Sequence, residues 1–575
     1  MDQRLDLDRV AVTMTPTRHG RASTVRFARV WLLVIPVVFL SAFFFYPVAS
    51  IVGLGLWPDG RFAFDRVAAT VSDPTVARVA WFTLWQAAAS TGLTLLIALP
   101  GAYVLARLDF PGRRVIRSLV TVPFVMPTVV VASAFLALLG PRSPINATSV
   151  ALFGSGAPTI DLRRTVAAIL IAHVFFNYAV VVRTVGGLWE HLDPRLEDAA
   201  RLMGATRWRT FREVTLPLLA PAVWSSAAIV FLFTFTSFGV VLILGGPTRA
   251  TIEVEIHRAT AQLLDLPLAS VLALLQLVAV VAALAVYGTL SRRVTGQRLV
   301  AADHAPRRAD DRASKILLRA NLAMMAVLLA TPLLVLVERS FAMPDGWGLD
   351  HYRALFAPAS TVLAVAPWQA IRNSLIFAAA ATLMALVVGT AASLAATDAR
   401  SLGARIVDRG LMLPLGTSAV TIGFGFLVAL NRPPLDLRGS LLLVPIAQAL
   451  VATPFVVRTV LPVLRSIDQR LRDAAGTLGA SPAKVWQEID LPIIGRAVLV
   501  AAGFSFAIAL GEFGATVFVA RAQMPTMPVA IFRLLGRPGV THFGQAMAMS
   551  TLLMVITAAA IVVIDRVRVG QIGRF

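Results

Sequence analysis

The segment from residue 192 to residue 217 reads LDPRLEDAARLMGATRWRTFREVTLP, and the segment from residue 467 to residue 492 reads IDQRLRDAAGTLGASPAKVWQEIDLP. An offset of 275 residues aligns the two segments without a gap. The same offset matches VVRTV at 181–185 with VVRTV at 456–460, and upstream an offset of 291 pairs Gly112 with Gly403 and Pro123 with Pro414. Repetition at a fixed offset predicts two parallel structural halves in one chain.

Each of the two segments has the residues that begin and end a helical hairpin. Asp193 can cap a first helix with Pro194 at its first position. Gly204 can end this helix, because glycine accepts the left-handed conformation of a C-terminal cap. Thr206 can begin a second helix, which we expect Pro217 to separate from the helix that follows.

The residues shared by the two copies are candidates for a docking surface, and an inert connection between helices is the alternative. Small alanine side chains in the shared set would allow another surface to approach closely. The shared candidates are Asp198, Ala199, Ala200, Gly204, Leu216 and Pro217 in the first copy, and Asp473, Ala474, Ala475, Gly479, Leu491 and Pro492 in the second.

Outside these segments the chain is too apolar for a water-soluble protein. Of its 575 residues, 57% are hydrophobic and only 14% charged, with a mean hydropathy of +0.77. Runs of about 20 apolar residues fit a bilayer core of about 30 Å, and twelve such runs can be counted. They are 31–54, 82–106, 116–139, 166–187, 218–245, 268–290, 316–337, 373–396, 407–430, 441–463, 493–520 and 543–564.

The net charge of +21 is explained by membrane topology rather than by nucleic-acid binding. With the N-terminus, the two repeated segments and the C-terminus on one side of the twelve spans, that side carries 36 basic and 19 acidic residues. The other side carries 16 basic and 12 acidic residues, so the net charges are +17 and +4. The positive-inside rule then predicts that both termini are cytoplasmic.

Two compositional facts exclude whole classes of site. The chain has no cysteine, so disulfides, thiolate metal sites and iron–sulfur clusters are excluded. Its only lysines, Lys315 and Lys484, follow Ser314 and Ala483, so no Gly-Lys-Ser/Thr phosphate loop exists. Any ATP that drives this protein must therefore bind to another chain.

The repeated pattern D-A-A-x3-G-x9-[V/I]-x-L-P resembles the EAA loop of binding-protein-dependent ABC importer permeases. Both copies depart from the family in one respect, since Asp198 and Asp473 stand where glutamate is common. The resemblance implies an all-α integral membrane protein of about twelve transmembrane helices, arranged as two pseudo-symmetric six-helix permease halves of the type I importer kind. It also implies that the two loops are coupling helices that dock onto cytoplasmic ATPase subunits.

The resemblance and the hydropathy together give the expected domain organisation. A cytoplasmic tail (1–29) precedes the first permease half (30–290), which contains the first loop (192–217). A basic cytoplasmic linker (291–315) leads to the second half (316–566), with its loop at 467–492, and a short cytoplasmic tail (567–575) ends the chain.

The resemblance also implies partners and location. We expect a multi-pass permease of the bacterial plasma membrane, in contact with membrane lipids and not with nucleic acid. Two ABC ATPase subunits, expected to be a homodimer, would bind ATP with Mg, while this chain would bind no cofactor, hold no metal and catalyse no reaction. An extracytoplasmic substrate-binding protein would deliver the cargo.

For the cargo, fused permeases are similar to those of thiamine and ferric-iron importers. The stretch 235–256, FTSFGVVLILGGPTRATIEVEI, and residues 172–177, AHVFFN, look most like a thiamine permease, so thiamine is expected ahead of ferric iron. The alternative is a single-chain ion-coupled secondary transporter, which can also have twelve helices in two parallel halves.

A few residues in the fifth and eleventh predicted spans are candidates for lining the translocation pathway. A carboxylate there is costly unless it faces a cavity or a partner, and it would suit a cationic cargo, although a purely structural glutamate is the alternative. Glycines would permit close helix approach and phenylalanines could narrow a pore, although ordinary helix packing explains both. The candidates are Glu512 with its repeat partner Ser237, and the pairs Phe238, Gly239 and Phe513, Gly514.

Overall fold

A computed structural model describes residues 32–569 apart from 59, 142, 155, 293–306, 345, 360–361, 398–409, 411–416, 432 and 434. Several predictions therefore lie outside the described residues. These are the tail 1–29, most of the linker 291–315, the end of the tail 567–575, and the start of the ninth span with Gly403 and Pro414.

Long apolar helices make up most of the described chain. Ten are long and apolar enough to cross a membrane, and a bent pair makes an eleventh candidate span. The ten are Leu32–Leu56, Pro74–Arg107, Val166–Glu190, Arg207–Phe235, Leu266–Val286, Arg312–Phe341, Pro367–Ala396, Leu443–Ser466, Pro482–Gly511 and Val540–Ile564. A shorter apolar helix, α21 (Ala419–Ala429), is the described part of the ninth predicted span. The all-α membrane fold with about twelve spans agrees with this structure.

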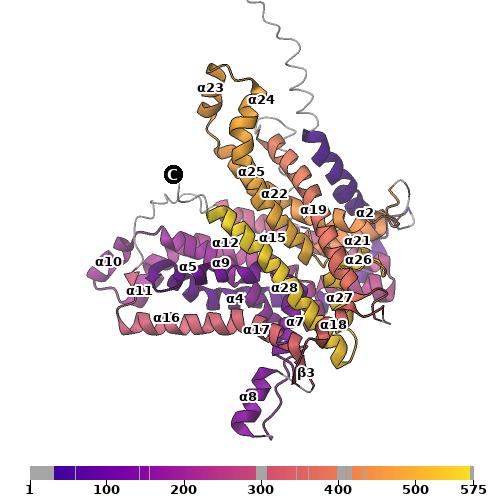
Figure 1. Ribbon diagram of the computed structural model, residues 1–575, viewed down its shortest axis with the longest axis horizontal. Coiled ribbons are helices and arrows are strands. Elements are labelled where there is room, and N and C mark those ends of the chain that lie inside the picture. Colours follow the sequence, from indigo (N-terminus) through magenta and orange to yellow (C-terminus); the bar gives the residue numbers. More distant parts are fainter. Residues whose placement is uncertain are drawn as a thin grey trace, which may run out of the picture.

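The labels of Figure 1 follow the chain. The longer helices are α2 (Tyr46–Leu56), α4 (Pro74–Arg107), α9 (Val166–Glu190), α12 (Leu216–Phe235), α15 (Leu266–Arg292), α16 (Arg312–Met325), α17 (Thr331–Phe341), α19 (Pro367–Ala396), α22 (Leu443–Ser466), α25 (Leu491–Gly511) and α28 (Val540–Val569). Shorter helices are α3 (Phe64–Ser72), α5 (Arg113–Leu119), α6 (Val122–Val125), α7 (Thr128–Leu138), α8 (Pro144–Phe153), α13 (Gly239–Leu244), α14 (Ile252–Arg258), α18 (Asp350–Arg353), α26 (Thr516–Val519) and α27 (Met527–Leu535). Two-residue strands form two pairs, β1 (Leu108–Asp109) with β2 (Arg307–Arg308) and β3 (Ala342–Met343) with β4 (Gly346–Trp347).

The repeated segments fold into two hairpins whose elements match closely at the offset of 275. The first hairpin contains α10 (Pro194–Leu202), α11 (Arg207–Thr210) and the π-helical turn η2 (Phe211–Thr215). The second contains α23 (Gln469–Thr477), α24 (Pro482–Val485) and the π-helical turn η6 (Trp486–Asp490). In Figure 1 they project at separate places, α10 and α11 at the left and α23 and α24 at the top.

Helix packing also repeats between the halves. In the first half α4 packs against α9 and both contact α12, while in the second half α19 packs against α22 and both contact α25. The halves exchange contacts as well, since α2 packs on α21 and α17 packs on α7. The two halves are therefore packed against each other through helices of both.

The structure departs from the predicted helix boundaries at several places, and the first is Pro217. Pro217 does not separate the hairpin from the next span, because the chain is helical without a break from Arg207 to Phe235. A π-helical turn precedes the proline, and the helix continues through it. In this turn the Leu216 N–H bonds to the Phe211 carbonyl, five residues back. Pro492 follows η6 in the same way.

The third predicted span bends by 103° between Arg113–Val125 and Thr128–Leu138. Met126 is extended because the following Pro127 disfavours a helical conformation at the residue before it. The fifth and eleventh spans end earlier than predicted, at Phe235 and Gly511. Ser237, Phe238 and Glu512 therefore lie in breaks after long helices rather than inside them.

Candidate functional site

The residues predicted to shape the two hairpins do so. Asp193 Oδ1 accepts a hydrogen bond from the Arg195 N–H at 2.9 Å, and Gly204 has a φ of +88° at the turn. Thr206 Oγ1 accepts from the Arg209 N–H at 3.3 Å, which caps the second helix.

The second hairpin repeats this geometry. Asp468 Oδ1 accepts from the Arg470 N–H at 2.9 Å, Gly479 has a φ of +82°, and Ser481 Oγ accepts from the Lys484 N–H at 3.3 Å. The predicted caps and turn residues are confirmed in both copies.

The tip of each hairpin presents an apolar side chain to solvent. Met203, just before Gly204, is 84% exposed, and Leu478, just before Gly479, is 88% exposed. The two residues occupy the same position of the repeat, yet they were not among the sequence-predicted candidates. The signal that could have found them is an apolar residue kept at one position in both copies of an otherwise polar segment. Each hairpin therefore exposes an apolar side chain at the same position of the repeat.

The shared residues of the predicted set are distributed around these tips. Ala199 and Ala474 are exposed, Ala200 is buried and Ala475 is half-buried. Of the two aspartates, Asp198 lies 3.4 Å from Arg307 Nη2, whereas Asp473 accepts a hydrogen bond from Gln469 Nε2 at 3.1 Å. Leu216 and Leu491, with Pro217 and Pro492, lie in the first turn after the π-helical segment, where the hairpin joins the span.

A side-chain interaction links the two helices of each hairpin, and we call it the brace. The acidic residue of the brace lies on the first helix in one hairpin and after the second helix in the other. In the first, the Thr215 hydroxyl donates to Glu197 Oε1 at 3.0 Å. In the second, Arg472 stands at the position of Glu197, and its Nη2 lies 2.8 Å from the carboxylate of Asp490, at the position of Thr215. The acid has moved from the first helix of the hairpin to the second, while the link between the helices is retained.

We expect Arg472→Glu to loosen the second hairpin by roughly 1–3 kcal/mol, between the values for exposed and buried ion pairs. The introduced carboxylate would face Asp490, so two like charges would meet. Adding Asp490→Thr recreates the brace of the first hairpin and should restore most of the loss. Limited proteolysis of the hairpin in the full chain measures the effect, and equal cleavage of the single and double variants would contradict it.

The breaks after α12 and α25 bring two of the predicted pathway residues, Phe238 and Phe513, into contact. The Phe238 and Phe513 rings stack at a centroid distance of 5.5 Å and an angle of 23°. A Cβ on Gly239 would lie 2.7 Å from Thr128 Oγ1, and a Cβ on Gly514 would lie 3.0 Å from Ala419 Cβ. These glycines allow the breaks to pack tightly against the starts of α7 and α21.

Two further rings pack against this stacked pair in tilted orientations. His257 lies 5.5 Å from Phe238, and Phe532 lies 5.4 Å from Phe513, centroid to centroid. His257 and Phe532 are also related by the offset of 275, so each half supplies one equivalent pair. We call Phe238, His257, Phe513 and Phe532 the four-ring cluster. It forms an apolar contact between the halves that sequence reasoning found only in part.

Ser237 and Glu512, which the repeat makes equivalent, are both held by hydrogen bonds. Ser237 Oγ lies 2.8 Å from His173 Nε2. The Glu512 carboxylate accepts from the Ala515 N–H at 2.7 Å, from the Thr516 N–H at 2.9 Å and from the Thr516 hydroxyl. Both oxygens of Glu512 are therefore engaged at the start of α26, as the structural alternative for this residue would require. Within the described residues, no three His, Asp or Glu side chains are placed to hold a metal ion.

Known proteins of similar sequence are membrane components of transport systems. Residues 95–296 match the family model described as "Binding-protein-dependent transport system inner membrane component". The thiamine transport system permease protein ThiP of Brucella abortus (strain 2308) is 30% identical over 519 residues, 88% of this chain and 90% of that protein. ThiP of Escherichia coli (strain K12) is 26% identical over 85% of this chain and 89% of its own length. A solved bacterial ABC transporter involved in alginate import aligns with 48% of this chain and 98% of its own at 17% identity, with a TM-score of 0.40.

Proposed function

Since this chain belongs to the family of binding-protein-dependent ABC importer permeases, with both permease halves in one polypeptide, we propose that it forms the translocation pathway for thiamine and couples that pathway to two cytoplasmic ATPase subunits. The observation that carries the coupling is the pair of matching hairpin tips, with Met203 and Leu478 more than four-fifths exposed. Apolar side chains in such exposed positions favour a partner that covers them.

The hairpins also favour one orientation in the membrane. They lie on the side that carries the net charge of +17, so they face the cytoplasm together with both termini. An ATPase dimer gripping both hairpins would bind ATP and Mg, and this chain would contribute no catalytic group. Because each hairpin runs without a break into its span, movement of a tip would pass along α12 or α25 to the four-ring cluster.

Thiamine is favoured over ferric iron by the relatives and by the chemistry of the centre. The relatives named above are thiamine transport system permeases. Thiamine is an aromatic cation, and aromatic faces attract such cations. A ferric ion needs hard oxygen ligands, whereas the four-ring cluster offers none and both Glu512 oxygens are already engaged.

Reconstitution in liposomes tests this function. The permease, its ATPase and its extracytoplasmic binding protein should import labelled thiamine when ATP is supplied on the hairpin side, and labelled ferric iron should not enter. Omission of the ATPase should abolish uptake. Thiamine uptake driven by an ion gradient without any ATPase would overturn the proposed coupling, and uptake of iron alone would overturn the proposed cargo.

A further inference from the structure

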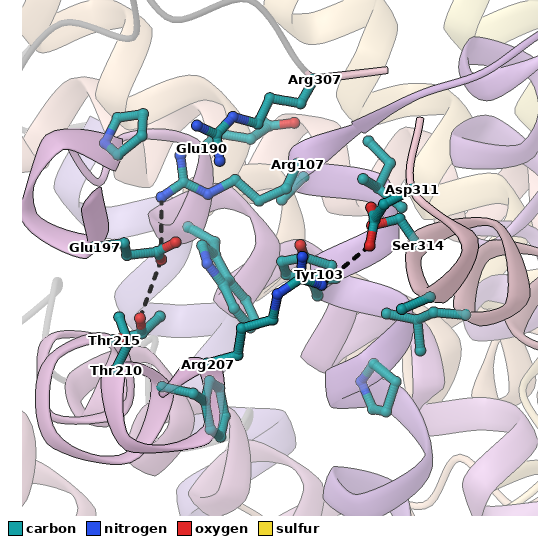
Figure 2. A pocket seen from close by; sticks show the side chains of 18 of the residues that line it. Tyr103, Arg107, Glu190, Glu197, Arg207, Thr210, Thr215, Arg307, Asp311 and Ser314 are labelled. Carbon is teal, nitrogen blue, oxygen red and sulfur yellow. Dashed lines mark hydrogen bonds and ion pairs between the residues drawn. The ribbon is translucent and has the colours of Figure 1, made fainter. Parts of the chain in front are cut away.

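A cavity of about 1050 Å³ lies behind the first hairpin, between the hairpin, the end of α4, α5 and the chain around β2 and α16. Figure 2 shows Arg107, Arg207 and Arg307 reaching this cavity from α4, α11 and β2. The exposed Met203 tip is not among the residues that line the cavity.

The lining of the cavity is strongly basic. Eight arginines and only four acidic residues line it, so its charge favours an anion. The arginines are Arg107, Arg113, Arg117, Arg195, Arg201, Arg207, Arg307 and Arg308, and the acids are Glu190, Glu197, Asp198 and Asp311.

Three residues that line the cavity carry buried hydrogen-bond donors without a partner among the described residues. They are Trp189 Nε1, Thr210 Oγ1, and Nε and Nη2 of Arg107. Trp189 is only 4% exposed and Thr210 only 2%. Arg107 Nη2 lies 3.7 Å from Glu197, an ion pair without a hydrogen bond. A buried donor without an acceptor destabilises the folded chain, so each needs a reason.

The internal repeat shows that the hairpin fold does not require these donors. At the offset of 275, Trp189 corresponds to Leu464 and Thr210 to Val485, both apolar. Arg207 likewise corresponds to Pro482. The second hairpin keeps the same helices and turns without any of the three. The Trp189 and Thr210 donors therefore belong to the first half alone, and the hairpin fold shared by the two halves does not require them.

The cavity also joins parts of the chain that are far apart in sequence. Strand β2 pairs in parallel with β1, with Leu108 opposite Arg307. Arg307 Nη2 lies 3.4 Å from Asp198, and Arg207 Nη1 donates to Asp311 at 3.0 Å (Figure 2). Hydrogen bonds from Ser314 and Arg207 hold the pKa of Asp311 below its usual value, which keeps this link charged. A molecule bound here would touch the first hairpin, α4 and the chain that leads into the second half.

We propose that this cavity binds the phosphate group of a phosphorylated ligand and thereby fastens the first hairpin to the chain between the halves. Phosphate oxygens would accept from the unpaired donors of Arg107, Trp189 and Thr210, and such charge-assisted bonds are strong. The apolar part of the ligand would pack against Leu99 and Leu317. A soluble phosphate ester and a phospholipid headgroup share this chemistry.

The test is the thermal stability of the solubilised full chain, titrated with inorganic phosphate against chloride at equal ionic strength. The wild type should be stabilised in a saturable manner. Thr210→Val introduces the residue found at the equivalent position of the second hairpin, and it should weaken phosphate binding about tenfold. The melting temperature without phosphate should stay unchanged or rise. Trp189→Phe should weaken phosphate binding similarly. Val485→Thr, the matched control, should gain no response.

Lipid nanodiscs separate the two sources of phosphate. If a headgroup is the ligand, phosphatidylglycerol should stabilise the wild type more than Thr210→Val and should remove the response to free phosphate. If a soluble ester is the ligand, the response to free phosphate should persist in both neutral and anionic nanodiscs. Equal behaviour of the wild type, Thr210→Val and Trp189→Phe in detergent and in nanodiscs would overturn the proposal. Binding is measured without ATPase or cargo, so the outcome is independent of the proposed transport function.

Discussion

The double variant Met203→Asp/Leu478→Asp should lose ATP-driven uptake almost completely. Each tip side chain is more than four-fifths exposed, and the proposed docking would bury it against an ATPase subunit. Aspartate at either tip would forfeit that apolar burial and would place a carboxylate in a desolvated contact, for a cost of about 3 kcal/mol per tip. That cost weakens each contact by roughly 100-fold. Co-purification of the ATPase with the permease, followed by uptake in liposomes, measures both consequences.

The neighbouring Leu202 provides a matched control. It is 90% exposed, as much as Met203, but its counterpart in the second hairpin is the polar Thr477. Leu202→Asp should therefore retain most ATPase binding, because the repeat already contains a polar residue at that position. Either single tip variant should keep one intact docking site and show an intermediate loss. Full ATPase binding by the double variant would show that the tips are not the docking surface.

Local rules explain why so much of the hairpins could be predicted from the sequence. Asp193, Gly204 and Thr206 act on backbone groups within three residues of themselves, so their effect depends little on the rest of the chain. The apolar spans are similarly determined by composition and length. The second copy of the hairpin carries the same signals, so each local prediction has an independent counterpart in the chain.

The errors arose where backbone geometry departs from the regular helix. Pro217 indicates a helix break, yet the helix continues through a π-helical turn in which the Leu216 N–H bonds to the Phe211 carbonyl. Hydropathy extended the fifth predicted span past Phe235, because the break is only three residues long and the apolar helix α13 follows it. Hydropathy measures how apolar a segment is, and it does not indicate where a helix ends or bends.

The candidate pathway could be predicted only in part, for a different reason. Phe238 and Phe513 were found because the repeat makes them equivalent, but their ring contact requires the two breaks to meet across the molecule. His257 and Phe532 are dissimilar residues, so the repeat alone does not mark them as a pair. For Glu512 the sequence left a pathway role and a structural role open, because its hydrogen bonds to Ala515 and Thr516 depend on a local turn that hydropathy cannot indicate.

The four-ring cluster should act as a barrier between the two sides of the membrane. Phe238 and Phe513 are 5% and 2% exposed, and their stacked rings are the point where equivalent breaks of the two halves touch. Truncating both to alanine removes the ring contact, worth about 0.5–1.5 kcal/mol beyond its area, and leaves a void that favours separation of the halves. We expect Phe238→Ala/Phe513→Ala to make liposomes leak thiamine without ATP, roughly tenfold faster than the wild type.

Phe231 and Phe235 allow this prediction to be distinguished from a general loss of packing. Their rings also stack, at 5.6 Å and 24°, but both belong to α12 and thus to one half. Phe231→Ala/Phe235→Ala should lower thermal stability by an amount similar to the cluster variant and should leave the liposomes closed to thiamine in the absence of ATP. The leak should therefore follow the contact between the halves and not the number of rings removed. If both double variants leak equally, or neither leaks, the four-ring cluster is ordinary packing and the barrier lies elsewhere along the pathway.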